Sequence, residues 1–249
     1  MQDKISCREG VYKGWKNAIE YLPKAGIAYI ELDERPVAEL RQVADACRAG
    51  GVTPLTIAGG VDACNPEAVA RVKTVCEAAE GIGVKHYFLS AHGKDRAAAM
   101  KALAEIGEHA AKHGVTLCLE THPPFCTNAA EMLRTMAEVN HPNVRINFDT
   151  ANVLFYNHGL NSADELEKVM SGVASLHLKD TTGKYRTTDF PVLGKGVVEF
   201  RRVFDTLHRV GLSGPLTIEL EGPVVDGLDV PGRHEKVVES TNHLREFAR

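Results

Sequence analysis

Short apolar runs alternate along the chain with longer stretches in which apolar residues recur every three to four positions. The short runs, in which apolar and polar side chains mostly alternate, predict β-strands. Eight such runs stand at 4–7, 28–32, 53–58, 85–91, 115–120, 144–149, 174–180 and 215–221. The longer stretches predict α-helices, as in the apolar stripes of 166–173 and 200–207.

Two local signals mark where the predicted helices begin and end. Ser162 and Glu165 have the spacing of a capping box, so we expect one helix to open there. Gly26, Gly114 and Gly211 stand just before predicted strands, where a glycine typically ends a helix.

Alternating strands and helices require parallel strand pairing with helical crossovers. Eight units in 249 residues (249/8) leave about 31 residues for each, which suits a closed barrel better than an open sheet. A doubly wound open sheet would usually begin with a glycine-rich turn, and the chain has no GxGxxG motif. We therefore predict an α/β protein, a (β/α)8 TIM barrel forming a single domain over residues 1–249, with an open sheet as the alternative.

Composition and charge narrow the class of protein. The net charge of -4 and a pI near 6.3 give no general attraction to nucleic acid or to an anionic membrane. No apolar run approaches the roughly 18 residues that cross a bilayer, and the first residues lack the apolar segment of a signal peptide. Six cysteines without CxxC spacing are typical of reduced thiols. We expect a cytoplasmic protein with no nucleic-acid or membrane partner.

The alternation within each strand predicts which side chains point toward the barrel axis. The apolar set must face the helices, so the polar set faces inward. Inward positions near the ends of four consecutive strands carry Glu120, Asp149, His177 and Glu219. Active sites of such barrels lie at this face. Buried charges cost several kcal/mol each unless they are paired or bind a metal ion.

Three carboxylates and one imidazole form a ligand set for a divalent ion. Any one of them alone is more typical of a salt bridge or a hydrogen-bonded core residue, but four in register favour a common site. Oxygen and imidazole donors suit Mn²⁺, Mg²⁺, Co²⁺ or Zn²⁺, and the residues do not choose among them.

The segments around these residues resemble the xylose isomerase-like TIM-barrel superfamily, and within it the sugar phosphate isomerase/epimerase group. The resemblance covers roughly residues 25–249, and the segments that carry it are LCLETHP, INFDTAN, LHLKD, LTIELEG and VLGKGVVEF. It implies one metal ion, Mn²⁺ as the first expectation, bound by Glu120, Asp149, His177 and Glu219. It also implies that Glu120 and Glu219 act as acid and base on a small sugar or keto-sugar, through an enediolate.

The candidate substrate contacts are His92, His122, Asn152, Lys179 and Arg186. In the resembling group, the positions of His122 and Asn152 commonly touch the substrate, although a His is usual where Asn152 stands. Lys179 faces inward by alternation, and His92 lies nearest the mouth among the earlier strands. Arg186 belongs to a loop nine residues after His177.

Several other functions remain open. A lyase on the same site, such as an inosose dehydratase or an enzyme eliminating from a 3-keto-sugar, is the main alternative, and Asn152 favours it slightly. A DNA repair nuclease of the same fold would need further histidines, one of them in place of Asn152. A non-catalytic barrel would not need both Glu120 and Glu219. We expect a carbohydrate partner, and homo-oligomers occur in the resembling group.

Overall fold

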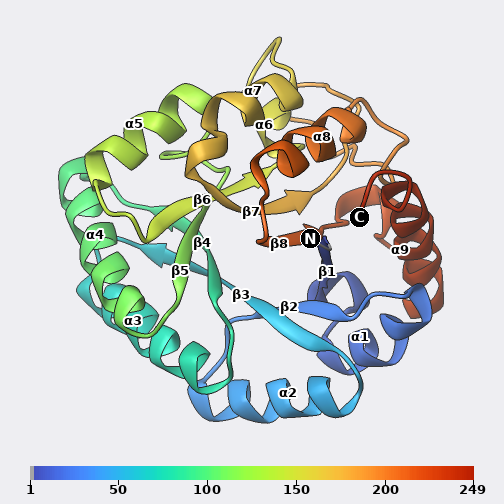
Figure 1. The fold of residues 1–249 in the computed structure, drawn as a ribbon, viewed down its shortest axis with the longest axis horizontal. Helices are drawn as coiled ribbons and strands as arrows, with labels where there is room; N and C mark the ends of the chain where they lie inside the picture. The colour runs from blue at the N-terminus through green and yellow to red at the C-terminus, as the bar shows by residue number, and fades with distance from the viewer. Residues whose placement is uncertain (1–2) are drawn as a thin grey trace.

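All eight predicted apolar runs form strands in the computed structural model, which describes residues 3–249. The strands are β1 (Lys4–Arg8), β2 (Tyr29–Asp33), β3 (Thr53–Asp62), β4 (His86–His92), β5 (Thr116–Glu120), β6 (Val144–Asp149), β7 (Val173–Leu178) and β8 (Pro215–Ile218). Each pairs in parallel with the next, and β8 pairs with β1, so the sheet closes (Figure 1). The TIM barrel is confirmed and the open sheet is excluded.

Helices surround the barrel as an outer ring (Figure 1). They are α1 (Trp15–Tyr21), α2 (Val37–Ala49), α3 (Pro66–Gly81), α4 (Arg96–Lys112), α5 (Ala129–Val139), α6 (Asn152–Phe155), α7 (Ser162–Val169), α8 (Phe200–Val210) and α9 (Val230–Leu244). Short 3₁₀ turns occupy Glu9–Tyr12, Pro23–Ala25, Met170–Gly172 and Gly222–Val224. Among the helices of residues 3–249, none combines the length and the apolar character that a bilayer crossing requires.

The side chains of the strands point in the directions that the alternation predicts. Phe148 and Leu176 are fully buried in the apolar core outside the barrel. Inside the barrel, Ser175 donates from Oγ to Oδ1 of Asn147 at 2.7 Å, and the hydroxyls of Ser6 and Thr217 lie 2.7 Å apart. These two pairs join neighbouring strands and satisfy buried polar groups, although Nδ2 of Asn147 and Oγ1 of Thr56 have no hydrogen-bond partner within residues 3–249.

The start of α7 differs from its prediction in one respect. The helix begins at Ser162, but its N-cap is Asn161, whose Oδ1 accepts hydrogen bonds from the backbone N–H groups of Ala163 and Asp164 at 2.9 and 3.1 Å. The predicted capping box is therefore wrong. An Asn in extended conformation directly before the first turn satisfies the free N–H groups itself.

The two residues of the predicted box serve other purposes. Ser162 is buried, and its Oγ has no hydrogen-bond partner within residues 3–249. Glu165 accepts from the backbone N–H of Ala129 at 2.7 Å and pairs with Lys168. Glu165 thus ties α7 to the start of α5.

The glycines predicted to end helices do so. Gly26 and Gly211 have φ of 69° and Gly114 has φ of 64°, which is the left-handed conformation that lets the chain leave a helix. Each precedes the strand that the sequence places after it.

Candidate metal centre

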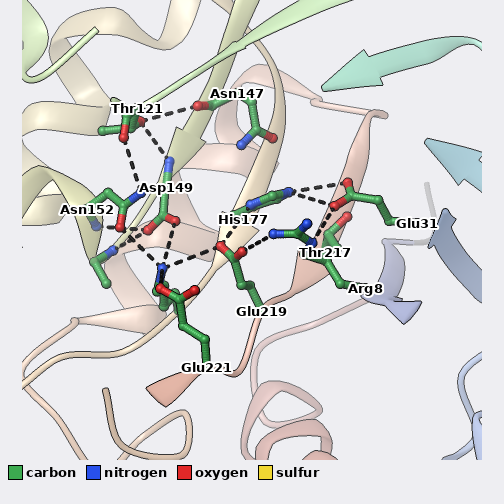
Figure 2. A network of polar contacts seen from close by, with 12 residues as sticks. Arg8, Glu31, Thr121, Asn147, Asp149, Asn152, His177, Thr217, Glu219 and Glu221 are labelled. Carbon is green, nitrogen blue, oxygen red and sulfur yellow. Dashed lines mark hydrogen bonds and ion pairs between the residues drawn. The ribbon is translucent and has the colours of Figure 1, made fainter. Parts of the chain in front are cut away.

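The four predicted ligands lie where the strands end. Glu120 and Asp149 are the last residues of β5 and β6, His177 lies in β7 directly beside Asp149, and Glu219 follows β8. Asp149, His177 and Glu219 are buried, and one donor atom of each lies within 4.8 Å of the others (Figure 2). Glu120 is half-buried and stands outside this group of three.

The imidazole of His177 is fixed on both edges and on one face. Its Nδ1 lies 3.0 Å from Oε2 of Glu219, and its Nε2 lies 3.1 Å from Oε1 of Glu31. The ring also stacks on Phe88, with centroids 4.3 Å apart and planes 16° apart. Such contacts leave the imidazole one orientation, which is a requirement for a precise ligand.

The two carboxylate oxygens of Asp149 have different surroundings. Oδ1 accepts from the backbone N–H groups of Ala151 and Asn152 at 2.8 and 2.9 Å. Oδ2 is buried and has no hydrogen-bond partner within residues 3–249. The turn after β6 therefore holds the carboxylate by one oxygen and leaves the other directed to the centre, as a metal ligand requires.

Two cationic side chains, those of Lys179 and Arg8, contact the acidic group. Nζ of Lys179 lies 3.3 Å from Oδ1 of Asn152, 3.6 Å from Oε2 of Glu219 and 3.8 Å from Oδ2 of Asp149. It also pairs with Glu221. Lys179 and Asn152, both predicted substrate contacts, are thus brought to the centre.

Arg8 is a member of the site that the sequence prediction missed. Its guanidinium donates to Glu219, and its Nε lies 3.4 Å from Oε1 of Glu31. The predicted first strand ended at residue 7, whereas β1 continues to Arg8. Alternation from the inward Ser6 would have assigned Arg8 to the interior.

Burial and charge shift the pKa values of the two central ligands. Burial raises the pKa of Asp149 to about 7, and the ammonium of Lys179 opposes this shift. Burial alone would lower the pKa of His177, but the carboxylates of Glu31 and Glu219 raise it to about 10. Within this network the imidazole is held as a cation between two anions.

The two predicted acid/base carboxyls have pKa values shifted in opposite directions. Burial raises the pKa of Glu120, and the negative charge of Glu219 adds to that rise. Burial alone would raise the pKa of Glu219 as well, yet Lys179, His177 and Arg8 hold it well below its usual range. The same mouth therefore contains one carboxyl that favours the protonated form and one that favours the ionised form.

The other three predicted substrate contacts make no hydrogen bond or ion pair to this network within residues 3–249. His92 is exposed at the end of β4, and His122 directs Nδ1 to the carbonyl oxygen of Pro123 at 2.7 Å. Arg186 is exposed, with its guanidinium over the ring of Tyr185. Within residues 3–249, no hydrogen bond or ion pair joins His92, His122 or Arg186 to the four predicted ligands.

The long connection between β7 and α8 is anchored by one carboxylate. Asp180 is fully buried and accepts from the backbone N–H groups of Gly194 and Gly196, each at 2.9 Å, and of Val198 at 3.1 Å. A Cβ at Gly196 would overlap the carboxylate of Asp180. The close approach of this backbone to Asp180 therefore explains Gly196, whereas Gly194 has a φ of 86° and a Cβ there would overlap the ring of His243.

The chain matches the model of the family described as xylose isomerase-like TIM barrel over residues 7–247. It belongs to the xylose isomerase-like TIM barrel family. Among curated relatives of this family member, the L-ribulose-5-phosphate 3-epimerase UlaE of Escherichia coli K12 is 25% identical over 169 residues. That alignment covers 64% of this chain and 58% of the relative, so the chain spans little more than half of the relative's length.

Solved structures of similar fold cover nearly the whole chain. A xylose isomerase domain protein from Planctomyces limnophilus has a TM-score of 0.82 at 23% identity, covering 99% of this chain and 98% of its own. A D-psicose 3-epimerase from Clostridium cellulolyticum H10 has a TM-score of 0.79 at 16% identity, covering 98% and 99%. An IOLI protein with a bound zinc atom has a TM-score of 0.79 at 18% identity, again covering 98% and 99%. At these identities the likeness is one of fold.

Proposed function

We propose that this chain is a metal-dependent isomerase or epimerase of a small sugar or keto-sugar. The observation that carries the proposal is the buried carboxyl of Asp149, one oxygen of which lies within 4.8 Å of donor atoms of His177 and Glu219, and whose Oδ2 accepts no hydrogen bond within residues 3–249. The names of relatives agree with this reaction class, because they include a ribulose-phosphate 3-epimerase and a psicose 3-epimerase.

The residues fit one divalent ion. Asp149, His177 and Glu219 would hold it, with Glu120 reaching in from β5 as the fourth ligand. Two or three carboxylates and an imidazole suit Mn²⁺, our first expectation, and also Mg²⁺, Co²⁺ or Zn²⁺. A bound divalent ion would supply Lewis-acid stabilisation of the negative charge that develops when a sugar ketone becomes an enediolate.

Glu120 and Glu219 are the proposed proton carriers. Glu120 ends β5 and Glu219 follows β8, and these strands are separated by β6 and β7 around the barrel (Figure 1), so the two carboxyls approach the centre from different sides. One carboxylate removes the proton next to the carbonyl, and the other carboxyl returns a proton to the opposite face, which inverts that carbon. Return of the proton to the neighbouring carbon gives isomerisation instead.

Lys179 and Asn152 are the proposed substrate-orienting residues. Nζ of Lys179 carries three donors and lies among Asp149, Glu219 and Asn152, so it can donate to a substrate oxygen that enters between them. The amide of Asn152 is anchored through its Nδ2 to the carbonyl oxygen of Thr121 at 3.2 Å. Its orientation is therefore set before substrate binds.

The same contacts support a lyase as the second candidate function. If the ammonium of Lys179 donated its proton to a β-hydroxyl of the enediolate, water would leave and the reaction would be an elimination. Asn152 cannot compete for that proton transfer, because an amide does not titrate in this range.

Deuterium exchange separates these reactions. The purified chain is incubated in D₂O with Mn²⁺ and a panel of pentuloses, hexuloses, their phosphate esters and inososes. We expect one deuterium next to the carbonyl of one substrate without loss of water, and loss of that exchange in Glu219→Gln and after chelation. Full turnover after rigorous metal removal contradicts the proposal, and loss of water identifies the lyase.

A further inference from the structure

A second group of candidate metal ligands lies on the helical ring. Glu77 belongs to α3, and His109 and His113 lie at the end of α4. One donor atom of each lies within 4.8 Å of the others. Because these positions are near the C-terminal ends of their helices, the group lies at the face where the strands begin, opposite the candidate metal centre.

We call these three side chains, together with Glu80, the α3–α4 cluster, although Glu80 stands outside the group of three and contacts only its member His113 within residues 3–249. Nε2 of His109 lies 3.1 Å from Oε1 of Glu77, and Nδ1 of His113 lies 2.8 Å from Oε2 of Glu80. The two imidazole centroids are 4.8 Å apart. A spacing of four residues places both rings on one face of α4, against α3.

The cluster is accessible but held in place. His109 and His113 have side-chain exposures of 27% and 25%, whereas those of Glu77 and Glu80 are 53% and 59%. The two helices pack side by side in the outer ring (Figure 1). An ion can therefore reach ligands that the helix packing already brings together.

Helix electrostatics favour a cation at this place. Glu77 and Glu80 lie near the C-terminal end of α3, which has no basic residue in its last turn. The C-terminal end of a helix carries partial negative charge, so two carboxylates there are unfavourable without a cation. The end of α4 directs a second negative pole to the same region.

A neighbouring pair provides a contrast. Nε2 of His141 lies 3.4 Å from Oε2 of Glu108, which is a His–Glu contact of the same kind. It has one imidazole, and within residues 3–249 it belongs to no group of three ligands. The α3–α4 cluster differs because it has a second imidazole, so two imidazoles and a carboxylate can bind one ion together.

We propose that the α3–α4 cluster is a binding site for a zinc-class ion that ties α3 to α4. His109, His113 and Glu77 are the ligands, and Glu80, which contacts His113, is the proposed fourth ligand after a change in its side-chain conformation. Two neutral imidazoles and carboxylate oxygen are a preferred ligand combination for Zn²⁺. An ion bound only by the folded chain stabilises it, by roughly 5–10 °C in Tm at a hundredfold excess over Kd.

The proposal does not depend on the proposed enzymatic function, and a zinc titration tests it. The full chain is treated with chelator, dialysed and titrated calorimetrically with ZnSO₄ at pH 7.5, and Tm is measured with and without zinc. We expect His109→Ala and His113→Ala each to lose one equivalent of zinc and several degrees of the zinc-induced rise in Tm. His141→Ala is the matched control and should behave as the wild type.

The outcomes separate the two sites. If His109→Ala loses one equivalent of bound zinc and Asp149→Asn keeps that equivalent, the result supports zinc binding by the α3–α4 cluster. This holds even if the barrel centre binds no zinc. Unchanged stoichiometry and Tm shift in both His109→Ala and His113→Ala overturn the proposal. If a variant is unstable, the zinc-induced change in the ¹⁵N resonances of both imidazoles in the wild type gives the same decision.

Discussion

Glu31 and His177 face each other in the interior of the barrel, with Oε1 of Glu31 3.1 Å from Nε2 of His177 (Figure 2). The opposite nitrogen, Nδ1, is directed to Glu219 and the candidate metal centre. A carboxylate behind a ligand imidazole fixes its tautomer and raises its basicity. Glu31 therefore lies where it can orient His177, one of the candidate metal ligands.

Glu31→Gln should weaken Mn²⁺ binding roughly 10- to 100-fold, because the amide still accepts a hydrogen bond but supplies no negative charge. Competition with a fluorescent chelator measures the change in Kd. Asp33→Asn is the control, since Asp33 pairs with the same Arg8 but does not touch His177. Equal loss of affinity in both variants would mean that only the general charge of the mouth matters.

Lys179→Met should have opposite effects on metal binding and on turnover. Removing an ammonium beside Asp149 and Glu219 removes repulsion of a divalent ion, so Mn²⁺ affinity should rise. Turnover should fall on the order of 100-fold, because the substrate loses its donor. In the metal-free variant the buried carboxylates lose their partner, so its Tm should be lower than that of the wild type. The increase in Tm on adding Mn²⁺ should then be larger than in the wild type.

Lys184→Met is the control for this prediction, because Lys184 is exposed on the loop that follows Lys179. Calorimetric Mn²⁺ titration, Tm and steady-state kinetics are compared for the three proteins. A Lys179→Met protein with unchanged turnover would remove Lys179 from the proposed set of substrate contacts.

Asp180→Ala should release the segment of residues 192–198. The carboxylate of Asp180 accepts from the backbone of Gly194, Gly196 and Val198, and its removal leaves these donors without that partner. The cost is about 1–3 kcal/mol for the N–H of the buried Val198, and it is smaller for Gly194 and Gly196, which are exposed and half-buried. We expect faster hydrogen exchange of 192–198 and a lower Tm, with a smaller effect in Asp180→Asn. Asp189→Ala, an exposed aspartate on the same loop, should change neither quantity.

The fold and the inward residues could be predicted from the sequence because both depend on one simple periodicity. Alternation along β6 and β7 fixed the direction of Asp149 and His177, and parallel strands bring their ends together. The same rule holds for Glu219, directly after β8, but not two residues later. β8 ends at Ile218, and Glu221, which alternation from Glu219 would direct inward, has a side chain that is 49% exposed even though it reaches Lys179.

Other features depended on information that periodicity does not contain. Arg8 was missed because the apolar run before it ended one residue short of the strand. The cap of α7 was misassigned because Ser162 and Glu165 match a motif that the chain does not use there. The role of Asp180 depends on a backbone segment that returns to it after 14 to 18 residues, which no local pattern encodes.

Asn161→Ala should destabilise the protein by about 1 kcal/mol, because the first turn of α7 loses its N-cap. Ser162→Ala should change the free energy of unfolding by less than about 0.5 kcal/mol, since its hydroxyl has no partner within residues 3–249. Urea unfolding of the two variants measures both values. A larger decrease in the free energy of unfolding for Ser162→Ala than for Asn161→Ala would support the capping box instead.

His86 should make stability depend on pH. Burial lowers its pKa to about 4, and the positive charges of Lys4 and Lys85 add to the shift. In the unfolded chain the pKa is about 6.5, so between these values the unfolded state binds a proton that the folded state does not. The contribution of the neutral imidazole is therefore complete above pH 6.5 and is lost as the pH falls toward 4.

His86→Gln should reduce this loss, by roughly 1–2 kcal/mol between pH 7 and pH 4.5 after allowance for solvent screening. Urea unfolding in the presence of chelator at pH 7.0, 5.5 and 4.5 gives the difference between variant and wild type, in which the titration of all other groups cancels. His92→Gln, which removes an exposed imidazole from the other end of β4, is the matched control. If wild type and His86→Gln lose stability in parallel over this range, another group causes the pH dependence, because a half-buried His86 that is neutral in the folded state must produce a difference between them.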